Sequence, residues 1–221
     1  MRNFVVLFLL CAGGWSLCAQ TGQGRFLEIT GTVEIKTGAA AAWSPAAVEM
    51  EISRNTVIST GFKSMAVIAL GNSTLTIRPL TKLTLEEILQ KENDEEVSLY
   101  LDTGRVRAEV SPPPGGRTGF SVRSASVTAS VRGTAFEFDT RHIQVDNGRV
   151  LYSGVNGQQV YVDGNERSYV DEAQNRVVPP FEAAAAALAP AIPELGATGN
   201  SAGGSTPVIQ TGTVQTAQTA W

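Results

Sequence analysis

The feature that most constrains the fold of this chain is an alternation of apolar and polar residues with a period of two, repeated through residues 20–178. In 97–101 and 127–131, for example, every second residue is apolar. Because successive side chains of a strand point to opposite faces, this pattern predicts strands that each bury one face. The segment 65–70, MAVIAL, is apolar throughout and predicts a central strand that is buried on both faces.

Turn signals separate these alternating segments at spacings of mostly 6 to 12 residues. Asn147-Gly148 and Asn156-Gly157 are typical of turns that need a positive φ. The spacing predicts a β-sandwich, a β-barrel or a β-solenoid. Segment 84–91 reads as a helix or as a strand that leads into a turn at Asn93-Asp94, and we predict the strand. Three consecutive prolines make 111–116 a rigid surface loop.

The two ends of the chain differ from this middle part. Residues 1–19 have a basic Arg2, a short apolar run over 4–10 and small residues before a predicted cleavage site after Ala19, which together predict a secretory signal peptide. A lipid anchor on Cys18 is a disfavoured alternative, because the large Leu17 precedes the cysteine. Residues 179–221 are rich in Ala, Pro, Gly and Thr and predict a short helix over 181–188 followed by a disordered tail.

The order of the predicted strands and turns between residues 24 and 169 resembles the FecR domain, a bacterial periplasmic all-β module named for the ferric-citrate signalling regulator. The segments that carry the resemblance are 31–33, Trp43, 57–61, 64–70, 74–79, 99–106, 120–122, 131–136 and 145–150. The resemblance implies an all-β fold for 20–178, a β-solenoid-like two-layer stack of short strands. The motif positions, to which we assign structural roles, are Gly61, Gly104, Val131, Arg132, Gly133, Thr134, Phe136 and Gly148.

The segment around Gly133 contains a change of face. Apolar residues take odd positions before Gly133 and even positions after it, which predicts a bulge or bend there. For Arg132 we favour a structural role, in which its guanidinium binds nearby carbonyls or a carboxylate such as Glu137 or Asp139. The alternative is a contact with a ligand or partner.

The composition of the chain limits the kinds of partner and catalytic site that it can have. The net charge of −4 disfavours a nucleic-acid partner. Both cysteines, Cys11 and Cys18, precede the predicted domain, which excludes a disulfide framework or thiolate metal site inside it. The one histidine, His142, predicts a surface turn residue, and no Gly-x-Ser-x-Gly elbow or P-loop occurs. We interpret the acidic run 86–96 as a solvated loop, with weak Ca²⁺ binding as the alternative, and Trp43 as a core residue rather than a carbohydrate platform.

These observations predict an exported, non-enzymatic module of the bacterial envelope that binds, scaffolds or senses a signal, without cofactor or metal. We expect an envelope protein or a cell-wall component as its partner. Since no cytoplasmic domain or membrane span precedes the module in the sequence, control of a sigma factor is not carried over from the ferric-citrate regulator. One alternative is a structural lipoprotein or wall-associated protein. Another is a secreted hydrolase using acids such as Asp102, Glu137 and Asp139.

Overall fold

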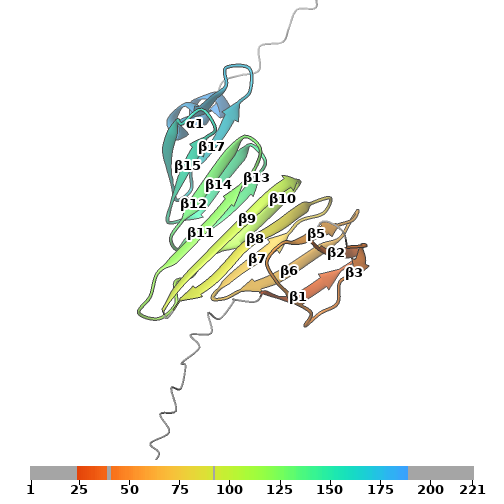
Figure 1. The fold of residues 1–221 in the computed structure, drawn as a ribbon. Coiled ribbons are helices and arrows are strands. Elements are labelled where there is room, and N and C mark those ends of the chain that lie inside the picture. Colours follow the sequence, from red (N-terminus) through yellow and green to blue (C-terminus); the bar gives the residue numbers. More distant parts are fainter. Residues whose placement is uncertain (1–23, 39–40, 92, 189–221) are drawn as a thin grey trace, which may run out of the picture. The chain divides into compact units, whose positions relative to one another are not determined.

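The computed structural model describes residues 24–38, 41–91 and 93–188, which form two nine-stranded sheets and one helix (Figure 1). Sheet A has the order β16 (Gln159–Asp163), β15 (Arg149–Gly154), β12 (Val127–Val131), β11 (Thr118–Arg123), β9 (Asp94–Thr103), β8 (Lys82–Lys91), β5 (Thr56–Thr60), β2 (Val33–Thr37) and β3 (Ser44–Pro45). Sheet B has the order β18 (Arg176–Val178), β17 (Arg167–Asp171), β14 (His142–Asn147), β13 (Ala135–Asp139), β10 (Arg105–Glu109), β7 (Ser73–Ile77), β6 (Met65–Leu70), β1 (Gly24–Thr30) and β4 (Glu51–Ile52). The predicted all-β class and the two layers are confirmed.

The chain changes sheet after every one or two strands, so both sheets grow together along the sequence. Among the described strands, every pairing is antiparallel except that of β9 with β11, which is parallel. A β-solenoid stacks successive rungs in parallel, and this part of the prediction is therefore not confirmed. The loop 111–116 lies between β10 and β11 and contains no strand, as its prolines predict.

The core lies between the two sheets and consists of the inward residues of the alternating segments. Its largest fully buried side chains include Tyr152, Phe26, Phe120, Phe136 and Phe138. Phe120 of sheet A and Phe136 of sheet B meet edge to face, with ring centroids 6.3 Å apart and an interplanar angle of 75°. Such a pair contributes about 0.5–1.5 kcal/mol beyond its buried area and here joins the two layers.

The predicted central strand β6 lies inside sheet B, between β7 and β1. Only one of its faces is fully buried, however. Ala66, Ile68 and Leu70 lie in the core, whereas Met65, Val67 and Ala69 are half-buried on the outer face. The expectation of two buried faces is wrong, because a sheet in a two-layer fold packs against the other layer on one side only.

Three local predictions are confirmed by the elements observed. Segment 84–91 belongs to β8, which forms a hairpin with β9. The face change at Gly133 falls between β12 and β13, where the chain passes from sheet A to sheet B. The short helix α1 (Pro180–Leu188) forms, buries Ala183, and holds Glu182 against Arg176 of β18 at 2.9 Å.

Two predicted environments are wrong. Trp43 is 42% exposed, and its ring lies 5.7 Å from the Lys36 ammonium, because it precedes the edge strand β3 and has no further strand to cover it. Within the acidic run, Glu95 is buried rather than solvated, and its carboxylate accepts a 3.2 Å hydrogen bond from the backbone N–H of Asn72.

The predicted signal peptide, residues 1–19, and the part of the predicted tail after residue 188 lie outside the described residues. In the part of the chain that is described, no helix has the length and apolar character needed for a membrane crossing.

Candidate functional site

The outer face of sheet B carries a charged groove where β10, β13, β14 and β17 lie side by side. The groove consists of two adjoining hollows of about 340 and 620 Å³. Both hollows are lined by Arg105, Glu137, Asp139 and His142. The period of two produces this face, because the residues between these positions, such as Val106, are buried in the core.

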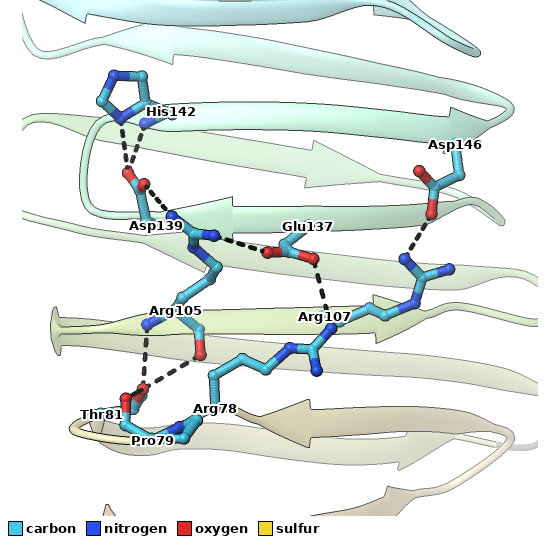
Figure 2. Close-up of polar contacts among 9 residues, drawn as sticks. All are labelled: Arg78, Pro79, Thr81, Arg105, Arg107, Glu137, Asp139, His142 and Asp146. Atoms are coloured by element: carbon cyan, nitrogen blue, oxygen red, sulfur yellow. Dashed lines mark hydrogen bonds and ion pairs between the residues drawn. The ribbon is translucent and has the colours of Figure 1, made fainter. Parts of the chain in front are cut away.

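Ion pairs across neighbouring strands fix the charges of the groove (Figure 2). Arg105 lies between two acids, with its Nη1 3.2 Å from Glu137 Oε1 and its Nη2 3.7 Å from Asp139 Oδ2. Arg78 approaches the other oxygen of Glu137 at 3.6 Å. The groove therefore presents an alternating pattern of positive and negative groups in a defined geometry.

A second pair extends this pattern along the same face. Arg107 of β10 reaches past β13 to Asp146 of β14, with Nη1 and Oδ2 2.6 Å apart (Figure 2). Directly opposite residues in the strand register are Arg105 with Asp139 and Arg107 with Glu137. The observed ion pairs therefore include diagonal contacts, which the length of the arginine side chain permits.

Asp139 also organises the turn between β13 and β14. Its carboxylate accepts hydrogen bonds from the backbone N–H groups of Arg141, at 2.9 Å, and His142, at 2.7 Å, and lies 3.0 Å from His142 Nδ1. Burial alone would raise the pKa of Asp139, but these hydrogen bonds outweigh it and hold the pKa below its ordinary value. Asp139 is thus an ionised anchor for the turn. The His142 ring lies on the exposed side, 5.8 Å from the Tyr169 ring.

A buried threonine, Thr81, fixes the backbone of Arg105 by a hydrogen bond. The hydroxyl of Thr81 accepts a 3.0 Å hydrogen bond from the backbone N–H of Arg105 (Figure 2). The Thr81 N–H donates to the Thr60 hydroxyl at 3.0 Å. Gly104 has a φ of +92° and passes directly over Thr81. A side chain at position 104 would collide with Thr81, so glycine is needed for the approach that places Arg105 in the groove.

Two exposed apolar side chains lie at the end of the groove. Leu80 lines the larger hollow, is 60% exposed and has a φ of +57°, a rare conformation for a bulky residue. Its backbone N–H donates to the carbonyl of Gly61 at 3.2 Å, which joins this turn to the next one, where Phe62 is 74% exposed. The structure therefore holds two apolar groups in solvent beside the charged groove.

The structure brings together only some of the residues singled out from the sequence. Glu137, Asp139 and His142 meet in the groove, whereas Asp102 lies on β9 and pairs with Lys82 at 3.0 Å. Gly61 and Gly104 lie in turns at the groove end, and Gly133 and Gly148 lie where the chain changes sheet. Val131, Thr134 and Phe136 are buried.

Arg132 is exposed beside sheet A, whereas Glu137 and Asp139, two carboxylates suggested as its partners, face outward on sheet B and pair with other residues. A structural role for Arg132 stays a prediction. Sequence reasoning also missed Arg78, Leu80, Arg105 and Arg107. The alternating arginines of RVRAE at 105–109 were an available signal for the charged face. No group of three or more His, Cys, Asp or Glu able to hold a metal ion occurs within the described residues.

The fold and this groove define a two-layer, all-β module with a polar outer face that is fixed by ion pairs. Residues 56–155, from β5 into the turn after β15, match the family described as FecR protein. The match over this segment confirms the resemblance to the FecR domain found in the sequence.

Two solved structures are also similar, both of a "putative anti-sigma factor" from Parabacteroides distasonis, determined at 2.50 and 1.65 Å resolution. Each has 16% sequence identity and a TM-score of 0.46, and the match covers 55% of this chain and 57% of the other. The match thus spans little more than half the length of those chains. A search of curated proteins finds no match.

Proposed function

We propose that this chain is an exported, non-enzymatic binding module of the bacterial envelope, which recognises a protein partner through the groove of sheet B. The observation that carries this proposal is the pair of exposed apolar residues, Leu80 and Phe62, at the end of a groove lined by fixed charges. The FecR domain supports a regulatory or sensing context for such an interaction. The predicted signal peptide at 1–19 supports the location.

The geometry agrees with the anatomy of protein interfaces. Binding energy concentrates in a few apolar or aromatic anchors, and polar groups around them determine which partner fits. Leu80 would act as such an anchor. Its exposed position requires a left-handed backbone, which destabilises the folded chain by about 1–2 kcal/mol for a residue with a side chain. The pairs of Arg105 and Arg107 supply the polar surround.

The engagement of the acids supports binding rather than hydrolysis. Glu137 is shared between two arginines, and Asp139 is held ionised by backbone N–H groups. A general acid has to give a proton to its substrate, whereas both carboxylates here are engaged as acceptors of these ion pairs and hydrogen bonds. Ser168, the serine that lines the smaller hollow, is buried, and its hydroxyl donates to the carbonyl of Val178 at 2.7 Å.

Site-specific photo-crosslinking in intact envelopes tests the proposal. We place a photoreactive phenylalanine analogue at position 80 or 62, and a control at Val155, which is equally exposed at 69% but lies in the turn after β15. We expect one envelope protein to be crosslinked from 80 and 62 and not from 155. Charge reversal of Arg105 to Glu should reduce the crosslink from position 62 several-fold.

Equal labelling from all three positions, or labelling that ignores Arg105, would show that the groove is not the interface. A panel of glycan and peptide substrates serves as the second arm of this experiment. Hydrolysis that is lost in Glu137→Gln and Asp139→Asn would replace the binding proposal by the enzymatic one.

A further inference from the structure

The opposite layer has its own hollow, on the outer face of sheet A, which the proposed function does not use. It measures about 580 Å³ and is lined by residues of β9, β11, β12, β15 and β16, which are neighbours in the sheet. Figure 1 labels the first four of these strands. We call it the sheet A trough and define it by Glu96, Gly119, Ser121, Ser130, Arg132 and Tyr161. Its residues come from segments as far apart as β9 and β16, so only the folded sheet assembles them.

Small residues form the floor of the trough. Gly119 is paired in register with Glu96, and Ser121 with Ser130. The small side chains of β11 and β12 therefore leave a depression in the sheet surface, whereas longer side chains project on both sides of it. The result is a concave surface with polar groups converging on it, which is the usual form of a small-ligand site.

Two arginines meet on one side of the trough. The pairing of β12 with β15 ends at Val131 and Val150, and the residues next to this last pair, Arg132 and Arg149, both line the trough. Like charges that face each other across strands are unfavourable. Arg149 is neutralised by Asp163, with Nε 2.5 Å from Oδ1 and Nη2 3.2 Å from Oδ2. Arg132 is exposed and makes no ion pair or side-chain hydrogen bond within the described residues.

An exposed aromatic ring completes the site. Tyr161 is 63% exposed, and the Arg149 guanidinium lies 5.6 Å from its ring centroid. That contact orders the ring beside the serine hydroxyls. An aromatic face and hydroxyls recognise the apolar faces and hydroxyl groups of a sugar ring, and a free guanidinium recognises a carboxylate with paired hydrogen bonds.

We propose that the sheet A trough binds a sugar chain that carries carboxylate groups. Arg132 pairs with a sugar carboxylate, Tyr161 lies against a sugar ring, and the Ser130 hydroxyl bonds a hydroxyl of the ligand. Among the described residues, Arg132 is the cation of the trough without an acidic partner, since Arg149 is neutralised by Asp163 and Glu96 adds a negative charge. This charge balance favours a ligand with isolated carboxylates over a densely charged polyphosphate. This assignment gives Arg132 the ligand contact that its placement away from Glu137 and Asp139 leaves open.

Calorimetric titration of purified residues 20–221 tests this assignment. The probes are tetragalacturonate, which is an acidic sugar, cellotetraose, a neutral sugar of equal length, and tetraglutamate, which has carboxylates but no sugar. We expect tetragalacturonate to bind at least 10-fold more tightly than either of the others. Its affinity should fall as salt is added, because the contact with Arg132 is partly electrostatic.

Variants identify the residues responsible. Arg132→Gln should weaken tetragalacturonate at least 10-fold, and Tyr161→Ala several-fold. Arg117 provides a matched control, since it is exposed, makes no side-chain ion pair in the described part of the chain, and lies outside the trough. Arg117→Gln should leave the affinity unchanged, and circular dichroism confirms that each variant is folded.

Three outcomes would overturn the proposal. If tetragalacturonate binds no more tightly than cellotetraose, the trough does not recognise the carboxylate. If tetraglutamate binds as tightly as tetragalacturonate, the trough does not recognise the sugar. If Arg117→Gln and Arg132→Gln weaken binding equally, the effect is one of net charge and not of the trough. None of these outcomes bears on the groove of sheet B, whose crosslinks from position 80 are measured independently.

Discussion

Replacing Gly104 by alanine tests whether the chain depends on a close approach at this turn or merely on a permissive residue. An ideal Cβ at position 104 would lie 2.5 Å from the Thr81 Cα, far inside the ordinary contact distance of about 3.5–4 Å. The partner atom is backbone and is held in place by the hydrogen bonds of Thr81 to Thr60 and Arg105. The strain therefore cannot be relieved by turning a side chain.

The magnitude follows from three contributions. A left-handed backbone costs alanine about 1–2 kcal/mol relative to glycine. Overpacking against a fixed neighbour adds about 1–3 kcal/mol, and loss of the Arg105 to Thr81 hydrogen bond adds about 1 kcal/mol. We expect Gly104→Ala to lower the free energy of unfolding by about 3–6 kcal/mol. With a urea m-value of about 2 kcal/mol/M, the midpoint falls by about 1.5–3 M.

Gly157 provides the matched control. It also has a positive φ, +84°, but a Cβ there would meet nothing within 4 Å. Gly157→Ala should cost only the backbone contribution of about 1–2 kcal/mol, a midpoint shift of about 0.5–1 M. Urea titrations followed by tryptophan fluorescence compare the two variants. If both lose the same stability, the close approach over Thr81 is not what requires glycine, and the argument for the support of Arg105 fails.

Further predictions concern stability, pH and location. Leu80→Gly should raise the unfolding free energy by about 0.5–1 kcal/mol in urea titrations, because relief of the left-handed strain exceeds the backbone entropy of glycine, while partner crosslinking from position 62 falls. The pKa of Asp139 is lowered in the folded state, so stability should fall as pH drops below about 4, and Asp139→Asn should make that fall shallower in acid titrations. Burial, followed by the charge of Asp139, raises the pKa of Tyr152, so Tyr152→Phe should leave the 295 nm absorbance change between pH 8 and 11 unaltered. The variant should cost about 0.5–1.5 kcal/mol through loss of the hydrogen bond from the Tyr152 hydroxyl to the Arg141 carbonyl, which still accepts the Val170 N–H. If the leader is cleaved after Ala19, Cys18→Ala should not change membrane partition, and a shift to the soluble fraction would favour the lipoprotein alternative.

The sequence by itself determined the local properties of this protein. Alternation with a period of two depends only on the geometry of an extended backbone, so it predicted the all-β class and the inward set around Phe136. The Asn-Gly and Thr-Gly turns depend on the conformational freedom of glycine and marked positions such as Gly104 and Gly148. The ordered segments around Val131 to Phe136 then led to the FecR domain, which the family match confirmed.

Only the tertiary structure decided which residues meet. Arg105, Glu137 and His142 share a groove because β10 pairs with β13 and β13 with β14, and strand order is not encoded in any one segment. Glu95 is buried and Trp43 exposed for the same reason, since burial depends on which strands cover a residue rather than on its own polarity. Arg132 and Arg149 line one trough because β12 pairs with β15, and a local pattern cannot supply this register, which is set by the packing of the whole sheet.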